Sequence, residues 1–341
     1  MGYVRWRQAM DQALYGRPDG FFVRAGGGPA AHFRTSVHAS PLFAGAVLRL
    51  ARWVDEALDR PDELVVCDIG AGRGELLVEL GAQARRQDPG LADRLRLRAV
   101  ERAERPAELP GWVEWTDRIE PVGAGLVFAN EWLDNVPCEI AERDGTGAAR
   151  YVLVDPATGD ERPGELLSRE DADWLDAAFG SAAERAELGG TRDRAWAEAV
   201  GSLGRGLAVA VDYAHTRADR PPFGTLTGYR AGRQVEPVPD GSCDLTAHVA
   251  LDACLDAAAA AHRRVTHSLW TTQREALRAL GVSGERPPLA LASTDPAGYV
   301  RALTAAGEAA ELTALGGLGS FLWGAQAVDM EIPAGWQTLC P

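Results

Sequence analysis

Short runs of consecutive apolar residues alternate with segments in which apolar positions recur at helical spacing. Residues 64–69 form such a run and include one acid near its end, the pattern of a parallel strand that is buried on both faces. Six further runs predict strands over 95–101, 112–115, 125–130, 207–212, 265–270 and 321–328. Helical spacing predicts helices over 41–58, 75–86 and 273–280. This alternation predicts an α/β fold with a doubly wound, mostly parallel sheet of seven strands.

Other segments lie outside this alternation. Residues 1–60 predict helices at both ends, with a glycine-rich break at 26–29. Residues 138–200 predict an α+β insertion with a hairpin of strands 139–143 and 151–154, followed by helices over 168–179 and 196–203.

The segment after residue 213 is predicted to be a long loop, rich in Pro and Gly, that reaches residue 243. Asp244 is then expected to cap an alanine-rich helix that ends at residue 261. The chain is thus expected to contain an N-terminal helical lid or substrate segment, a core in two parts and an insertion on the substrate side. Their bounds are 1–60 for the lid, 61–137 and 201–341 for the core, and 138–200 for the insertion.

The amino-acid composition excludes several classes of reaction and of binding partner. The 341 residues carry a net charge of −14, and all 35 basic residues are arginines. Without lysine there is no Schiff-base chemistry and no P-loop that ends in Lys-Ser or Lys-Thr. The acidic balance argues against nucleic acid as a partner and is compatible with a cationic substrate.

The five cysteines are far apart and form no C-x-x-C pair, so neither a zinc ribbon nor a disulfide framework is indicated, and we expect no metal site. The N-terminus lacks an apolar signal core, and no run of 18 apolar residues occurs. We therefore expect a reduced, cytoplasmic protein without a membrane segment.

The densest chemical signal is the glycine-rich sequence Asp68-Ile69-Gly70-Ala71-Gly72-Arg73-Gly74, at the end of the first strand of the core. Glycines there permit a tight turn and a close approach of a ligand to the main chain. A nicotinamide-binding loop has the spacing G-x-G-x-x-G, but position 75 is Glu, which would repel a pyrophosphate at the start of the next helix. A cationic nucleoside such as S-adenosylmethionine (SAM) suits Asp68 and this loop better.

Two further acids follow the next strands. Glu101 ends the second strand, where a carboxylate can accept hydrogen bonds from both ribose hydroxyls. Asp117 lies just past the third strand, where an adenine amino group is expected, although a solvated loop acid is an equal interpretation. An ordinary turn is the alternative for the glycine loop, and Glu101 at the right strand end argues against it.

Glu131 and Asp134 lie three residues apart just beyond the fourth strand. On a helical turn this spacing places both carboxylates on one face, so we expect them to clamp the substrate and to accept its proton. The alternative is a solvated helix start whose acids offset the helix dipole. Trp132, inside the same segment, is expected to lie near the ligand.

Segments over most of the chain resemble, in the same order, those of one family. They are residues 13–16 with 20–22, 33–36, 40–43, the glycine loop, 129–137, 212–213, 244–249 and 271–273. The chain resembles the MidA-like family of SAM-dependent methyltransferases, which includes the mitochondrial complex I assembly factor that methylates an arginine. The sequence departs from this family at His32, at Val37-His38 and at Ala214, and the first two departures lie in the segment expected to cover the cofactor.

The resemblance implies a class I methyltransferase, Rossmann-like fold with SAM as cofactor. Together with the loop and its acids, it assigns cofactor binding to Thr35, Ser36, Asp68, Gly70, Ala71, Gly72, Gly74, Glu101, Asp117, Asn130 and Glu131. It places Trp132, Asp212, Tyr213 and Asp244 on the substrate side, and Glu131, Asp134 and His248 in catalysis.

The histidines leave alternatives open. Asp244, His248, Asp252 and Asp256 recur at four-residue spacing, which fits the solvated face of one helix, while the resemblance moves Asp244 and His248 towards the cleft. The other two candidates are His32 and His38, which are either general bases or surface loop residues.

Three functions remain. The first is a SAM-dependent methyltransferase that acts on a protein or peptide nitrogen, and the resemblance implies an arginine guanidinium. The second is a methyltransferase with a small biosynthetic acceptor, and the third is a non-catalytic binding or assembly protein of the same fold. An oxidoreductase is disfavoured by the glycine spacing. We expect no nucleic-acid or membrane partner and allow for a homodimer.

Overall fold

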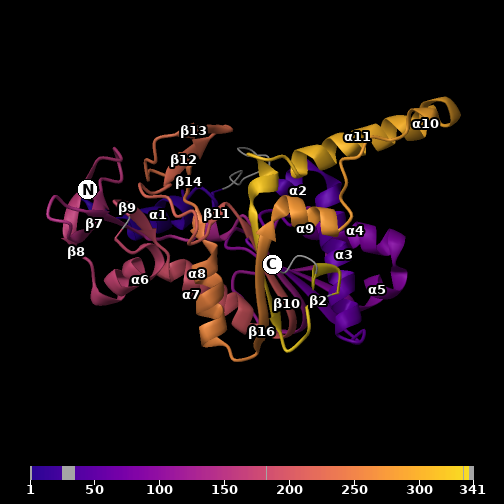
Figure 1. The fold of residues 1–341 in the computed structure, drawn as a ribbon, viewed down its shortest axis with the longest axis horizontal. Coiled ribbons are helices and arrows are strands. Elements are labelled where there is room, and N and C mark those ends of the chain that lie inside the picture. Colours follow the sequence, from indigo (N-terminus) through magenta and orange to yellow (C-terminus); the bar gives the residue numbers. More distant parts are fainter. Residues whose placement is uncertain (1, 25–34, 182, 333, 338–341) are drawn as a thin grey trace.

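The central element of the molecule is a seven-stranded sheet (Figure 1). The computed structural model describes residues 2–24, 35–181, 183–332 and 334–337, so the expected break at 26–29 and His32 lie outside the described residues. The strand order is β16-β17-β10-β5-β2-β3-β4, and β17 runs antiparallel to both of its neighbours while the other pairs are parallel. These strands are β2 (Leu64–Ile69), β3 (Leu95–Val100), β4 (Val113–Thr116), β5 (Val122–Asn130), β10 (Leu203–Asp212), β16 (Val265–Thr272) and β17 (Leu322–Val328). The seven predicted strands and their mostly parallel arrangement are confirmed.

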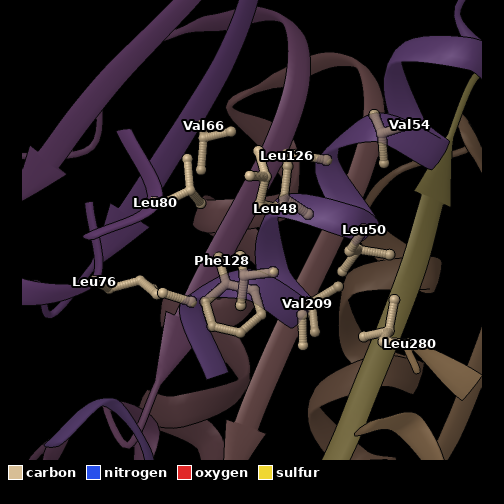
Figure 2. Close-up of a cluster of buried hydrophobic side chains, with 14 of the residues drawn as sticks. Leu48, Leu50, Val54, Val66, Leu76, Leu80, Leu126, Phe128, Val209 and Leu280 are labelled. Atoms are coloured by element: carbon tan, nitrogen blue, oxygen red, sulfur yellow. The ribbon is translucent and has the colours of Figure 1, made fainter. Parts of the chain in front are cut away.

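Helices cover both faces of this sheet. One hydrophobic cluster contains side chains of α3 (Pro41–Ala57), α4 (Glu75–Gln87), α5 (Pro89–Arg94), α9 (Gln273–Ala279) and α11 (Pro296–Leu312). The other contains side chains of α7 (Gly190–Gly201) and α8 (Leu251–Ala261). In β2, Val66 packs in the first cluster while Val65 and Cys67 pack in the second, because successive side chains point to opposite faces. Figure 2 shows part of the first cluster, which includes Leu48 of α3 and Leu126 and Phe128 of β5.

A second sheet is built mainly from the insertion. Its order is β1-β7-β6-β9, and β8 pairs with β7. The strands are β1 (Val4–Arg5), β6 (Glu139–Arg143), β7 (Ala149–Val154), β8 (Glu161–Leu166) and β9 (Arg185–Leu188), with α6 (Arg169–Phe179) beside them. The predicted hairpin is β6 and β7, while β8 and β9 were not predicted because their sequences have no apolar run of strand length.

The first 60 residues contribute to both parts of the molecule. Val4 pairs with Val154, and α1 (Trp6–Tyr15) packs in a hydrophobic cluster with side chains of β6, β7 and β14. Of the next described helices, α3 packs on β5 of the central sheet, and α2 (Ser36–Ala39) packs against α3, α4 and α11. Ser40 caps α3 by accepting a hydrogen bond from the Leu42 N–H, and Pro41 follows in the first turn as predicted.

The segment from 214 to 250 differs from the prediction. It contains β11 (Ala214–His215), β12 (Thr227–Arg230), β13 (Arg233–Val235), β14 (Asp244–Thr246) and β15 (Val249–Ala250). Asp244 pairs with Tyr229 of β12, and α8 begins only at Leu251, so the predicted cap at Asp244 is wrong. Pairing with β12 and burial of Leu245 against α1 outweigh the local helix propensity.

The C-terminal part adds α10 (Leu289–Thr294) and α12 (Ala334–Gln337), and α11 extends away from the sheet with α10 at its outer end (Figure 1). Two short 3-10 helices, η2 (Leu133–Asn135) and η3 (Leu318–Ser320), follow β5 and precede β17. Within the described residues, no helix combines the length and the apolar character that crossing a membrane requires.

Candidate active site

The glycine loop connects β2 to α4 at the carboxyl edge of the sheet. Gly70, Gly72 and Gly74 have φ values of 73°, 59° and 85°, which favour glycine over other residues. A Cβ atom on Gly70 would lie 2.9 Å from Cδ1 of Trp132, so the loop and the segment after β5 pack too closely for a side chain. The turn therefore requires the glycine spacing that the sequence contains.

The loop's own N–H groups are already bonded. Those of Gly70 and Ala71 donate to Val100 O, at 2.9 and 3.3 Å, and that of Gly74 donates to Ala71 O at 2.8 Å. The Gly72 N–H donates to Oε2 of Glu101 at 3.1 Å.

The Arg73 N–H donates to Oε2 of Glu75 at 3.0 Å. Since all five N–H groups of residues 70–74 have partners, the loop does not offer the anion cradle that a dinucleotide pyrophosphate needs.

Two cavities flank the loop and share Gly70, Gly72, Glu131 and Asn135. We call the first the acidic cavity, because its lining includes the carboxylates of Asp68, Glu75, Glu131, Asp134 and Asp244. We call the second the Glu101 cavity, which is also lined by Tyr15, Ile69, Asp117 and Trp132. A ligand that lies along the glycine loop can therefore occupy both.

Main-chain N–H groups hold both carboxylate oxygens of Glu101. Its Oε2 accepts the Gly72 N–H, and its Oε1 accepts the Ala103 N–H at 3.0 Å. Burial raises the pKa of Glu101, against the opposing effect of these N–H donors. A carboxylate held at both oxygens keeps lone pairs free for two neighbouring hydroxyl groups. Asp117, just past β4, lines the same cavity.

Four of the five carboxylates of the acidic cavity have raised pKa values, and Glu75, which bonds to His38, has a lowered one. Burial raises the pKa of Glu131 to about 7 and raises the pKa of Asp134. Burial and neighbouring carboxylates raise the pKa values of Asp68 and Asp244 well above their usual range. A cationic ligand would relieve this repulsion and favour the ionised forms.

Glu131 follows β5 in a strained conformation. Its φ of 52° is uncommon for a residue with a side chain, and its N–H donates to Val211 O at 2.8 Å. Its Oε1 accepts hydrogen bonds from the Ser36 N–H at 3.1 Å and from Nδ2 of Asn130 at 3.0 Å. Glu131 is therefore not on a helical turn with Asp134, as the spacing had predicted, although both carboxylates line the acidic cavity.

Asp134 lies in η2, and the Asp212 carboxylate holds this element through hydrogen bonds. Oδ2 of Asp212 accepts the N–H groups of Leu133 and Asp134, at 2.9 and 3.2 Å. Thr246 donates its hydroxyl to Oδ2 of Asp134 at 2.6 Å, while Oδ1 of Asp134 is buried without a partner among the described residues. A buried carboxylate oxygen without a hydrogen bond is uncommon and calls for an explanation, in a residue that lines the cavity.

Arg192 of α7 holds the same segment from the other side. Its fully buried guanidinium donates to the carbonyl oxygens of Asp134 at 2.8 Å, His248 at 2.9 Å and Val136 at 3.3 Å. Sequence reasoning missed this residue because its partners lie 56 or more positions away.

Most predicted site residues line one of the two cavities. Thr35, Asp68, Gly70, Ala71, Gly72, Asn130, Glu131, Asp134, Tyr213 and Asp244 line the acidic cavity. Glu101, Asp117 and Trp132 line the Glu101 cavity.

Four predicted residues line neither cavity. Gly74 is the N-cap of α4, and Asp212 lies beneath η2. Ser36 is buried, and its side chain bonds to Gln273. His248 lies between β14 and β15, where its ring stacks on Tyr213 with centroids 5.7 Å apart, so its predicted place at a helix start is wrong.

Aromatic and polar residues from distant segments complete the acidic cavity. Tyr229, Thr246, Leu318 and Phe321 line it, and the rings of Tyr213 and Phe321 lie 4.0 Å apart. Thr246 belongs to a segment that the resemblance contained. No local pattern identifies Tyr229, which lies in β12, or Phe321, which lies between η3 and β17.

The residues present fit SAM. The buried Oδ1 of Asn130 has no partner among the described residues, and Asn130 and Asp68 line the acidic cavity where an ammonium group can be accepted. On the other side of the loop, the Glu101 carboxylate, which accepts two main-chain N–H groups, would be able to accept the ribose hydroxyls. A mostly parallel sheet with a glycine loop and an acid at the next strand end is the arrangement of a SAM-dependent methyltransferase.

Comparisons with known proteins agree with this class. The family model described as "Putative S-adenosyl-L-methionine-dependent methyltransferase" matches residues 49–269, more than half of the chain. The chain belongs to this family, and the protein is a SAM-dependent methyltransferase with SAM as its cofactor. A comparison with curated proteins finds no match.

Two solved structures from Burkholderia thailandensis share the fold. One, described as a "likely methyl transferase" and bound to S-adenosyl-homocysteine, is 24% identical, with a TM-score of 0.78 over 97% of this chain and 89% of its own. The other, described as an uncharacterized protein of the same superfamily, is 23% identical, with a TM-score of 0.67 over 97% of this chain and 88% of its own.

Proposed function

We propose that the protein transfers a methyl group from SAM to a nitrogen of a cationic acceptor, namely the guanidinium of an arginine in a protein or peptide. The observation that carries this proposal is the acidic cavity itself, in which Glu131, Asp134 and Asp244 lie together with raised pKa values. A guanidinium has five N–H donors and a positive charge, which match a group of carboxylates.

The aromatic side of the cavity supports the same acceptor. Tyr213, Tyr229 and Phe321 line it, and Tyr213 is 41% exposed, so its ring is accessible from outside. Planar cations bind well to aromatic faces, and a guanidinium does so more often than an ammonium. The cavity thus combines aromatic rings on which a guanidinium can stack with carboxylates that can accept its N–H groups.

Each acid has a role in this proposal. SAM supplies a methyl group activated by a sulfonium. Asp134, with its unpartnered Oδ1, and Asp244 orient the guanidinium and pull its charge to one side. Glu131 accepts the proton that the nitrogen loses as it gains the methyl group, so the product guanidinium keeps a single charge. A pKa of about 7 suits a base that works near neutral pH.

Labelled SAM tests the acceptor. The protein is incubated with methyl-labelled SAM and arginine-containing peptides, or with a cell extract separated into macromolecules and small molecules. Label on arginine in a peptide or protein supports the proposal. Label found only in the small-molecule fraction would instead assign a small biosynthetic acceptor, and label on lysine or on oxygen would refute guanidinium transfer.

A matched pair of peptides sharpens this test. Peptides with arginine or with citrulline at the same position differ by one positive charge and have nearly the same shape. Because the acidic cavity is expected to recognise that charge, only the arginine peptide should accept label or compete for binding. Equal competition by the citrulline peptide would contradict a role for the carboxylates in acceptor binding.

A further inference from the structure

His38 is at the centre of a short chain of hydrogen bonds at the edge of the acidic cavity. Its Nδ1 lies 2.6 Å from Oγ1 of Thr35, and its Nε2 lies 3.3 Å from Oε1 of Glu75. All three residues line the cavity, although they come from α2 and the residue before it and from the first turn of α4. Two successive contacts thus connect a carboxylate, an imidazole and a hydroxyl.

The α-carboxylate of the cofactor is the group that the acidic cavity repels. SAM has an α-carboxylate, and five acids line this cavity. The N–H groups of residues 70–74 already have partners inside the protein. The carboxylate of Glu75 accepts the Arg73 N–H and its own backbone N–H, so an acid already occupies the start of α4.

The lining of the acidic cavity includes one basic side chain among the described residues, that of His38. Among the described residues that line the acidic cavity, His38 is the only one that can carry a positive charge. The hydrogen bond to Glu75 raises the pKa of His38, against the opposing effect of burial, and Glu75 and Glu131 add favourable charge interactions. The imidazolium form is thereby favoured in the protein.

The charge of the ring decides what the Thr35 hydroxyl can do. An imidazolium donates at both nitrogens, to Oε1 of Glu75 and to Oγ1 of Thr35. The Thr35 hydroxyl then has its own proton free to donate to a ligand. A neutral ring that keeps its proton on Nε2 accepts that proton at Nδ1 instead, and the cavity loses a donor.

We propose that Thr35 and His38 bind the α-carboxylate of SAM, with the Thr35 hydroxyl as the donor, the His38 imidazolium as the compensating charge, and Glu75 as the residue that holds the imidazolium in place. This inference concerns the cofactor alone and does not depend on the identity of the methyl acceptor. It explains how a cavity rich in carboxylates accepts a ligand that carries a carboxylate of its own.

Decarboxylated SAM isolates the group in question, because it differs from SAM by the α-carboxylate alone. Binding of both compounds is measured by calorimetry without an acceptor, so no turnover is involved. His38→Gln should weaken SAM binding by about tenfold, the effect of losing one charge-assisted hydrogen bond, and should leave the affinity for decarboxylated SAM within about twofold. Thr35→Val should have the same selective effect.

Two control variants accompany these substitutions. Thr35→Ser keeps the hydroxyl and should bind SAM like the wild type. His267→Gln makes the same change at another histidine whose Nε2 faces a glutamate, Glu331, at 3.6 Å, on β16 and outside both cavities. It should leave both affinities unchanged.

The selectivity between the two compounds decides the result. A loss of SAM affinity in His38→Gln and Thr35→Val, with that of decarboxylated SAM retained, supports the proposal. Equal weakening of both compounds would show that the substitutions disturb the cavity as a whole, and unchanged affinity for both would show that the carboxylate binds elsewhere. Either of these two outcomes overturns the inference.

Discussion

Glu131→Gln separates catalysis from cofactor binding at one position. The amide keeps the shape of the side chain, and its oxygen can still accept the hydrogen bonds that the Ser36 N–H and the Asn130 amide donate. What the change removes is a base with a pKa of about 7. Loss of a positioned general base typically lowers kcat by about 10²- to 10⁴-fold, while the affinity for SAM should stay within about twofold.

The same substitution should stabilise the ligand-free protein, in a manner that depends on pH. The pKa of Glu131 rises from 4.5 to about 7 on folding. Ionisation of Glu131 therefore opposes folding, and this opposition is absent below pH 4.5 and complete above pH 7. Since one pH unit corresponds to about 1.4 kcal/mol, the expected gain in free energy of unfolding is up to about 3 kcal/mol at pH 8.

Three measurements check this reasoning: kcat with an arginine peptide, calorimetry with SAM, and thermal unfolding at pH 5 and pH 8. Glu139→Gln, at a buried glutamate of β6 outside both cavities, is the control and should leave turnover unchanged. Unchanged turnover in Glu131→Gln would refute its role as base. A large loss of SAM affinity would assign the residue to the cofactor, and a lower Tm at pH 8 would refute the argument from burial.

Three further substitutions test the framework of the site. Gly70→Ala places a methyl group 2.9 Å from Cδ1 of Trp132 in a conformation with φ of 73°, and should lower stability by about 1–3 kcal/mol and SAM affinity with it, as read by Tm and calorimetry. Glu101→Gln should weaken binding of S-adenosyl-homocysteine by about tenfold or more, whereas Glu104→Gln, at an exposed neighbour, should not; equal effects would argue against ribose recognition. Arg192→Met leaves three carbonyl groups without their buried donor, so it should lower the free energy of unfolding by about 3–5 kcal/mol, and denaturant unfolding that matches the wild type would contradict this.

The sequence predicted the central sheet well because its signals are local. A strand buried on both faces needs an uninterrupted apolar run, and β2 has one in which all six residues are buried. It predicted the small strands poorly for the same reason. Strand β8 is mostly exposed, and β14 holds an acid that reads as a helix cap until its pairing with Tyr229 is known.

The sequence also predicted some features of the candidate site correctly and others incorrectly. Asp68, Glu101 and Glu131 could be found because each lies at the end of a predicted parallel strand, and parallel strands bring their carboxyl ends to one edge. The helical spacing assumed for Glu131 and Asp134 does not occur, since Glu131 adopts a left-handed conformation and η2 begins after it. The two acids nevertheless line one cavity.

The sequence by itself determined the order of strands and helices along the chain, the turn at residues 70–74 and the acids at the strand ends, because these depend on neighbouring residues. Only the tertiary structure decided that Asp212 lies under η2, that Arg192 holds three carbonyl groups and that His38 meets Glu75. The physical reason is that such contacts join segments from different parts of the chain. Their strength comes from burial, which excludes water and exists only once the whole chain has packed.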